Sequence, residues 1–345
     1  MHTKGFAAPD TKAAIEQARL YIEQAETLGE PPEDPLLLLS VLYGFWAAGF
    51  VAFKGDVVRD LAAQFLALAE GQAATVSLMQ GHRLMGISLI CTGDIAEGQV
   101  HLDRAIALYN PAEHRPLATR FGFDSGVSIL IWRSLSLWIR GYPDAALESV
   151  NEALKEAHKI GQATTLMFAL TYTSLAYIWC GDYAAANAQT DELIALTDEK
   201  GAVFWKVAAT ILEGCILAVT DKAPIAVNMI TSGVAAWRST GSTACMPLWL
   251  SYLAQAHAKL GGLAYAWHCI GEATTAVENT KEKWCEAEIH RIAGEVALKS
   301  PEQDTAKAEA YFERARCRSP AASEVLGTPR RNEHGAALAR SGQAG

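Results

Sequence analysis

Residues 161–201, GQATTLMFALTYTSLAYIWCGDYAAANAQTDELIALTDEKG, contain two helix-like segments separated by a short glycine turn. The apolar first segment ends at Gly181, and the alanine-rich second segment runs towards Gly201. Glycine supplies the left-handed backbone conformation that ends a helix, and a following aspartate can cap the next one. The stretch therefore predicts a pair of helices, over residues 166–180 and 184–197.

The same pattern returns along the chain with a period of forty residues. Its markers are Gly161, Gly201 and Gly241; Gly141, Gly181 and Gly261, with Asp221 in the place of a missing glycine; and Ala146, Ala186, Ala226 and Ala266. Such a period is typical of a helical array in which each helix pair buries its apolar face against its neighbours. We expect an all-α solenoid of about six to seven helix pairs rather than a non-repetitive bundle. Solenoids usually bind rather than catalyse.

The pattern resembles the tetratricopeptide repeat, whose two helices cross closely at small residues. Small residues stand in the first helix at Gly86, Ser134, Ser174, Gly214, Ala254 and Gly294. The matching pairs in the second helix are Gly98 with Ala105, Ala146 with Ala153, Ala186 with Leu193, Ala226 with Gly233, Ala266 with Ala273 and Ala308 with Ala315. The resemblance implies a right-handed superhelix of helical hairpins.

Bulk composition excludes several classes of function. The chain has 345 residues, a net charge of −9 and 50% hydrophobic residues, with no basic stripe that would neutralise nucleic-acid phosphates. Its 7 cysteines are an odd number and contain no C-x-x-C, which argues against disulfides and zinc. We expect a cytoplasmic protein without a cofactor, a metal or a nucleic-acid partner, and of unknown oligomeric state.

Residues 36–53, LLLLSVLYGFWAAGFVAF, are eighteen consecutive residues without a charge. This length lies at the lower limit of what can span a bilayer. The stretch also falls where the repeat places a buried first helix, and it contains Ser40, Gly44 and Gly49. We favour a buried helix over a membrane span.

No catalytic signature is visible. The phosphate-binding G-x-x-x-x-G-K-[ST] and G-x-G-x-x-G loops, H-E-x-x-H and G-x-S-x-G do not occur. Glu286, Glu288, His290 and Arg291 form one dense polar cluster at helical spacing, which is usual for a salt-bridged helix face and less so for a site. We therefore predict a chain that is not an enzyme and has no catalytic residues.

Two sets of residues are candidates for partner binding. In the tetratricopeptide family the first helix of each unit lines the concave groove, and carrying this over implies an apolar, aromatic groove for a peptide or protein. The implied groove residues are Arg83, Ile131, Trp138, Phe168, Thr171 and Trp179. The alternative is that the aromatic residues among them are core between repeats. The other set lies in an insertion at residues 110–126, where His114, Arg115 and Arg120 can contact a partner or can belong to a solvated connector.

Three stretches resemble the C-terminal repeat region of bacterial signalling proteins that carry an adenylate or guanylate cyclase domain and an ATPase domain. They are residues 112–129 (AEHRPLATRFGFDSGVSI), 235–241 (AAWRSTG) and 281–295 (KEKWCEAEIHRIAGE). The resemblance implies a signal-transduction role as a regulatory segment, with a partner protein or a neighbouring ATPase domain. It brings no catalytic residue with it. The alternative is a freestanding adaptor unconnected with cyclase signalling.

The expected organisation has three parts. Residues 1–10 form a disordered N-terminus, 11–316 the solenoid and 317–345 an irregular tail rich in arginine, glycine and proline. Back-translated and read one base later, the tail gives an alanine-rich helix where the repeat requires one. We therefore hypothesise a frameshift near Arg316, which would leave the last unit uncovered.

Overall fold

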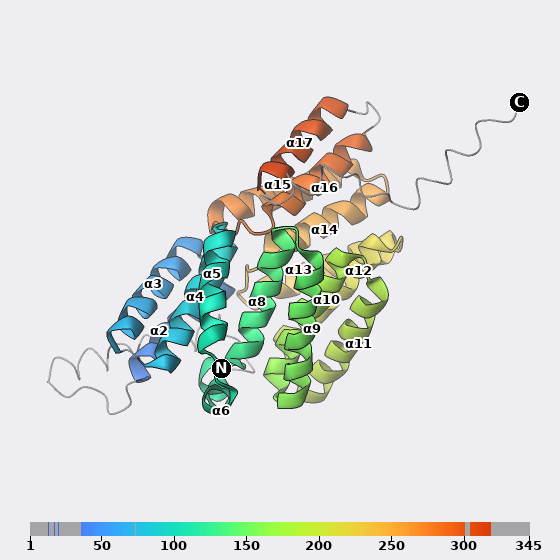
Figure 1. Ribbon diagram of the computed structural model, residues 1–345. Helices are drawn as coiled ribbons and strands as arrows, with labels where there is room; N and C mark the ends of the chain where they lie inside the picture. Colours follow the sequence, from blue (N-terminus) through green and yellow to red (C-terminus); the bar gives the residue numbers. More distant parts are fainter. Residues whose placement is uncertain are drawn as a thin grey trace, which may run out of the picture.

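The computed structural model describes residues 36–72, 74–300 and 304–318, together with Ala13, Gln17 and Leu20, and all regular secondary structure of these residues is helical (Figure 1). The larger helices are α2 (Leu37–Val51), α3 (Gly55–Gln72), α4 (Thr75–Thr92), α5 (Ile95–Leu108), α8 (Ser125–Ile139), α9 (Pro143–Ile160), α10 (Ala163–Cys180), α11 (Tyr183–Lys200), α12 (Val203–Val219), α13 (Ala223–Ser239), α14 (Met246–Lys259), α15 (Leu263–Thr280), α16 (Glu286–Leu298) and α17 (Thr305–Arg318). Three short elements, α6 (Pro111–His114), η1 (Arg115–Leu117) and α7 (Ala118–Phe121), lie within the insertion.

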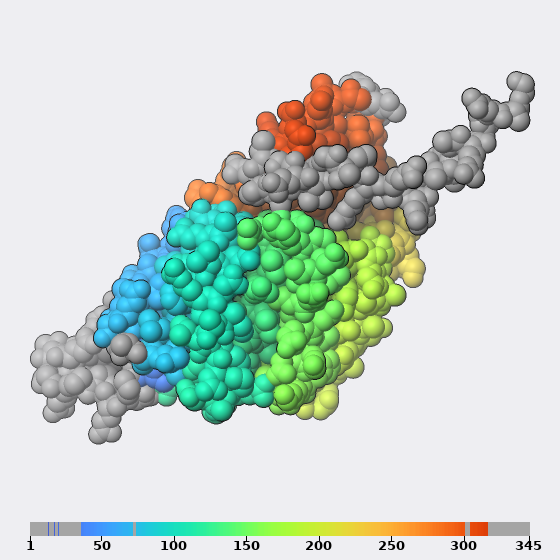
Figure 2. All heavy atoms as spheres, in the orientation of Figure 1, coloured from blue at the N-terminus to red at the C-terminus, as the bar shows by residue number. Residues whose placement is uncertain are grey.

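Consecutive helices pack as hairpins that stack on one another. The hairpins are α2/α3, α4/α5, α8/α9, α10/α11, α12/α13, α14/α15 and α16/α17. On the face drawn in Figure 2, the surface from α5 through α8 and α9 to α11 is continuous, so each unit covers the next. The fold is the all-α, tetratricopeptide-like helical-hairpin solenoid that the forty-residue period predicts.

The turns use the backbone conformation that the glycine series predicts. Gly161, Gly181 and Gly201 have φ angles of +68°, +80° and +61°, which lie in the left-handed region. Asp221 and Lys281 take the places of glycines in the two series and adopt the same conformation, each with φ of +64°. The repeat therefore enforces its turn geometry even where a side chain makes it costly.

Small residues mark the close crossings inside hairpins. A Cβ atom at Gly294 would lie 2.6 Å from the Phe312 ring, and one at Gly214 would lie 2.7 Å from the Ile230 side chain. Because no larger residue fits there, these positions determine how closely the two helices of a unit approach.

The uncharged stretch at residues 36–53 folds as α2 with the turn that follows it. Leu39, Trp46 and Phe53 are buried in the main core. No described helix combines the length and the apolar character that crossing a membrane requires.

The described residues include the first two residues of the expected tail. The last helix runs to Arg318, two residues beyond the expected end of the solenoid. Residues 1–10 and 319–345 lie outside the described residues, so the disordered N-terminus, the irregular tail and the frameshift stay predictions.

Candidate functional site

Apart from the insertion between α5 and α8, two connections between hairpins are longer than the others. The turns before α10 and α12 span only residues 161–162 and 201–202, whereas residues 241–245 precede α14 and residues 281–285 precede α16. We call these the first crossing loop (residues 241–245) and the second crossing loop (residues 281–285). In both, the following helix begins only after a turn, at residues 244–245 and 284–285.

Both crossing loops bind the N-terminal hairpins across the inside of the solenoid. The backbone N–H groups of Thr243 and Ala244 donate to the Val51 carbonyl at N···O distances of 3.0 and 3.2 Å. The Lys283 N–H donates to the Cys91 carbonyl at 2.8 Å. Because Val51 ends α2 and Cys91 lies near the end of α4, the last hairpins are tied to the first ones.

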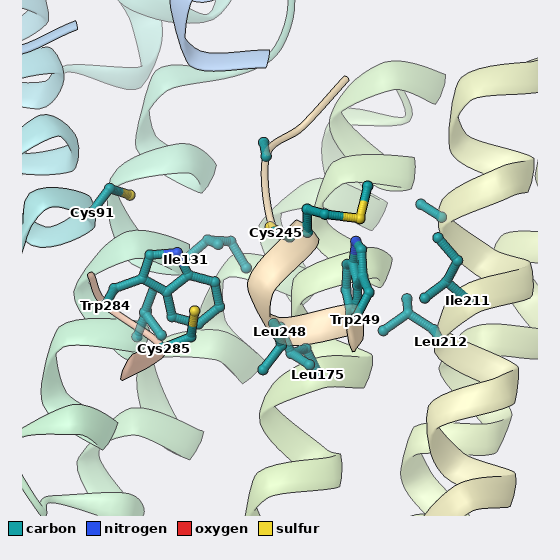
Figure 3. Close-up of a cluster of buried hydrophobic side chains, with 14 of the residues drawn as sticks. Cys91, Ile131, Leu175, Ile211, Leu212, Cys245, Leu248, Trp249, Trp284 and Cys285 are labelled. Carbon is teal, nitrogen blue, oxygen red and sulfur yellow. The ribbon is translucent and has the colours of Figure 1, made fainter. Parts of the chain in front are cut away.

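Glu282 joins the two crossing loops. It is 1% exposed, and its carboxylate accepts hydrogen bonds from the Cys245 N–H at 2.9 Å and from the Trp284 indole Nε1–H at 2.8 Å. Figure 3 shows the Trp284 and Cys285 side chains beside Ile131 of α8, deep in the core. The second crossing loop is therefore held by one buried carboxylate and one buried indole.

Burial controls the protonation of this region. Burial raises the pKa of Glu282 to about 7, although the hydrogen bonds from Trp284 and Cys245 act in the opposite direction. Burial, aided by the nearby Glu282 carboxyl, also raises the pKa of the Cys91, Cys245 and Cys285 thiols. These thiols stay protonated and unreactive.

The first crossing loop covers an inner cavity of about 150 Å³. Its walls are mostly aromatic: Tyr43, Trp46, Phe50, Phe123, Trp132, Phe168, Tyr172, Phe204, Trp205, Trp237 and Trp249. Several of the lining residues are half-buried, among them Phe123, Thr164, Phe204 and Trp205. Such a cavity suits a small apolar group.

Arg83 is the one charged residue among the residues that line the inner cavity. It is fully buried; its Nε donates to Gln80 Oε1 at 2.7 Å and its Nη1 to Ser128 Oγ at 3.2 Å. The guanidinium also lies 5.4 Å from the centre of the Tyr43 ring. Its Nη2 is buried without a hydrogen-bond partner.

A second hollow, the open groove, has a volume of about 770 Å³ and lies between the ends of α8 and α10 and the last hairpin, α16/α17. Trp138 and Trp179 stack at 4.6 Å in its wall, and Trp284 lies 5.9 Å from Trp179. Its charged lining residues are Glu288, Arg291, Glu309, Glu313 and Arg316. The open groove and the inner cavity share no lining residue.

The structure divides the six predicted groove residues among three environments. Arg83, Phe168 and Thr171 line the inner cavity, and Trp138 and Trp179 line the open groove. Ile131 is 2% exposed and packs in the core between them. The six residues therefore do not form one continuous surface, because the crossing loops occupy the space between them, and their role in partner binding stays a prediction.

The insertion is folded onto the solenoid. Its end is tied to α2, where the Tyr43 hydroxyl donates to the Phe121 carbonyl at 2.5 Å, and to α10, where the Thr164 hydroxyl donates to the Gly122 carbonyl at 2.9 Å.

The three predicted insertion residues differ in exposure. His114 is fully buried, and its Nδ1 accepts from the Asn110 N–H at 2.9 Å. Arg115 forms an ion pair with Glu156, and Arg120 is exposed beside Ser40. Of the three, Arg120 has the exposure that contact with a partner requires.

Sequence reasoning missed the crossing loops. One signal was available, because Pro247 stands at the start of α14 and a proline is tolerated in the first turn of a helix but not deeper inside it. No comparable residue precedes α16. Nothing in the sequence distinguishes Glu282 from a surface glutamate, because its burial depends on packing against Cys245 in another repeat unit.

The polar cluster at the start of α16 has the character of a helix face. Arg291 pairs with Glu288 at 2.6 Å and also with Glu295, both within the same helix. No group of three or more His, Cys, Asp or Glu that could hold a metal ion is present in the described part of the chain.

Comparisons with known proteins show the fold alone. No protein-family model matches the chain, and no curated protein matches it. Among solved structures, the chain is similar to aspartyl phosphate phosphatase F from Bacillus subtilis, with a TM-score of 0.55, 17% identity, and coverage of 86% of this chain and 79% of that chain. It is also similar to a Rap protein complexed with competence and sporulation factor, with a TM-score of 0.52, 14% identity, and coverage of 93% and 95%. A tetratricopeptide repeat protein from Parabacteroides merdae ATCC 43184 matches with a TM-score of 0.44, 13% identity, and coverage of 88% and 93%.

Proposed function

We propose that this chain is a non-catalytic repeat scaffold that holds an apolar, basic segment of a partner protein in the open groove. The observation that carries the proposal is the aromatic wall of that groove, where the half-buried Trp138 and Trp179 stack on each other and Trp179 contacts the buried Trp284. Clustered tryptophans are the side chains most often responsible for binding energy in protein interfaces. The solved Rap protein of similar fold is complexed with competence and sporulation factor, which supports the use of such a solenoid for binding.

The charges around the groove favour a basic partner. The positive charge of Arg291 is balanced by its ion pairs with Glu288 and Glu295. Glu309 and Glu313 are exposed, stand four residues apart on the face of α17 that borders the groove, and outnumber the remaining lining cation, Arg316. A helical or extended segment with aliphatic or aromatic residues flanked by lysine or arginine complements this arrangement.

Selection from a library of short peptides tests the proposal. We expect the full chain to select apolar sequences with basic flanks, and we expect the double variant Glu309→Lys/Glu313→Lys to lose most of their affinity. The matched control is Glu148→Lys/Glu152→Lys, because these glutamates are also exposed and four residues apart, but on α9 outside the groove. Selected peptides that bind the groove variant normally would overturn the proposal, as would the selection of no peptide above background.

We further propose that the scaffold is the regulatory segment of a larger signalling protein with cyclase and ATPase domains. The three stretches that carry this resemblance form the insertion, the end of α13 before the first crossing loop, and the second crossing loop with α16. The first and third of them contain residues that bond to distant units, and the second leads directly into the first crossing loop. The nucleotide sequence of the locus tests this: cyclase and ATPase coding in front of the repeat supports it, and an isolated gene supports the freestanding adaptor.

A further inference from the structure

The inner cavity combines two features that are costly to a protein without a ligand. Its space of about 150 Å³ forfeits packing contacts that the surrounding side chains would otherwise make. Its wall also contains Arg83, a fully buried cation. Both costs fall if a ligand fills the space and neutralises the charge.

Arg83 has no directly bonded counter-ion in the described structure. Its side-chain hydrogen-bond partners, Gln80, Ser128 and Tyr43, are all neutral. The carboxylate of Asp124, in the neighbouring insertion, accepts hydrogen bonds from the Tyr109 hydroxyl at 2.8 Å and from the Val127 N–H at 2.9 Å. A buried guanidinium with only neutral partners is unfavourable, because neutral groups repay little of its lost hydration.

The unpaired polar atoms on the cavity wall are donors. Arg83 Nη2 and Trp249 Nε1 are both buried without a hydrogen-bond partner, and both residues line the cavity. Two other indoles on the wall already have acceptors, because Trp46 donates to Ser88 Oγ at 2.9 Å and Trp237 to the Ala244 carbonyl at 2.9 Å. A complementary ligand therefore carries acceptor oxygens and no donor of its own.

Size and wall chemistry define the rest of the ligand. An apolar cavity of about 150 Å³ is large enough to hold one benzene-sized ring. The surrounding aromatic side chains offer edge and face contacts that favour an aromatic ring over a branched aliphatic group. A cationic ligand, which aromatic walls alone would attract, is repelled by Arg83.

We propose that the inner cavity binds a small aromatic carboxylate, whose ring fills the aromatic space and whose carboxylate accepts hydrogen bonds from Arg83. Arginine matches a carboxylate in charge and in planar geometry. The inner cavity shares no lining residue with the open groove, so this proposal does not depend on the proposed binding of a partner protein.

Calorimetry and thermal unfolding of the full chain with phenylacetate test the proposal. We expect saturable binding and a raised Tm. Phenylacetamide, which has the same shape without the charge, should bind about tenfold more weakly or worse, and benzylamine should not bind. Absence of phenylacetate binding, or equal affinity for phenylacetamide, would overturn the proposal.

Variants locate the site. Arg83→Met should abolish the preference for phenylacetate over phenylacetamide, whereas the control Arg133→Met, which removes a surface ion pair with Asp103, should keep it. Ala208→Leu and Ala47→Val add volume to two different walls of the cavity and should each weaken binding strongly. If a folded variant of either alanine binds phenylacetate as the unmodified chain does, the ligand lies elsewhere and the proposal is wrong.

Discussion

The Gly201 turn and the second crossing loop occupy equivalent places in the repeat but do different things. At Gly201 the chain leaves α11 and enters α12 at Val203, and the backbone N–H groups of residues 201–203 donate to carbonyls within residues 197–201. At Lys281 the chain makes the same left-handed turn, then continues through Glu282 and Trp284 to contact α4. The comparison shows that periodic residues build the solenoid, whereas the non-periodic residues that follow them close it and shape its cavities.

The largest effect should come from removing the anchor of the second crossing loop. Trp284 is 6% exposed and donates to Glu282, so Trp284→Ala loses both packing and a hydrogen bond. We expect a loss of about 3–5 kcal/mol in the free energy of unfolding, measured by urea denaturation. Tyr265→Ala is the control, because Tyr265 is 67% exposed and should change stability by less than about 1 kcal/mol. A similar small change at Trp284 would show that the loop does not hold the solenoid closed.

The second prediction concerns pH and Glu282. Its folded pKa of about 7 lies above the ordinary value of 4.5, so the folded state keeps a proton that the unfolded state releases first. The stability that this proton contributes is fully present below about pH 4.5 and is lost as the pH rises through about 7, a loss of about 3 kcal/mol. Glu282→Gln should remove this dependence and should unfold at a higher temperature than the unmodified chain at pH 8.

The control for this prediction is Glu272→Gln. Glu272 forms a surface ion pair with Arg238, and its replacement should leave the pH dependence of Tm unchanged. If the unmodified chain and the Glu282→Gln variant have parallel curves of Tm against pH, Glu282 is not the titrating group.

A smaller effect should follow at a regular turn. Gly201→Ala places a Cβ on a residue with φ of +61°, where no neighbouring atom lies within 4 Å, so the cost is conformational strain alone. We expect about 1 kcal/mol of destabilisation in urea unfolding. A loss as large as that of Trp284→Ala would contradict the separation between regular turns and crossing loops.

The smallest effect, in the opposite direction, is expected where the glycine series is interrupted. Asp221→Gly relieves the strain at φ of +64° but removes the ion pair that the 92% exposed Asp221 side chain makes with Lys259 at 3.0 Å. Because exposed pairs contribute little, we expect a net gain of about 0.5 kcal/mol. Asp221→Asn, which keeps a side chain that tolerates this conformation, should differ little from the unmodified chain. A loss of stability in Asp221→Gly would show that the ion pair, and not the backbone, dominates this turn.

The sequence by itself determined the repeat, the hairpins and the close helix crossings. These features depend on residues that are near each other in the chain: a glycine and the helix it ends, or Gly294 and Phe312 across one hairpin. The physical cause in each case is local, either backbone strain or the space between two consecutive helices. For that reason the periodic pattern alone was sufficient to predict them.

Only the tertiary structure decided the crossing loops, the burial of Glu282, and the division of the predicted groove into an inner cavity and an open groove. The contact between Ser242 and Val51 joins residues 191 positions apart, and no local pattern encodes it. Whether Arg83 is an exposed groove residue or a buried cation depends on the first crossing loop and the insertion covering it. Burial and its electrostatic consequences are properties of the packed chain, because they depend on which distant segment excludes water from a side chain.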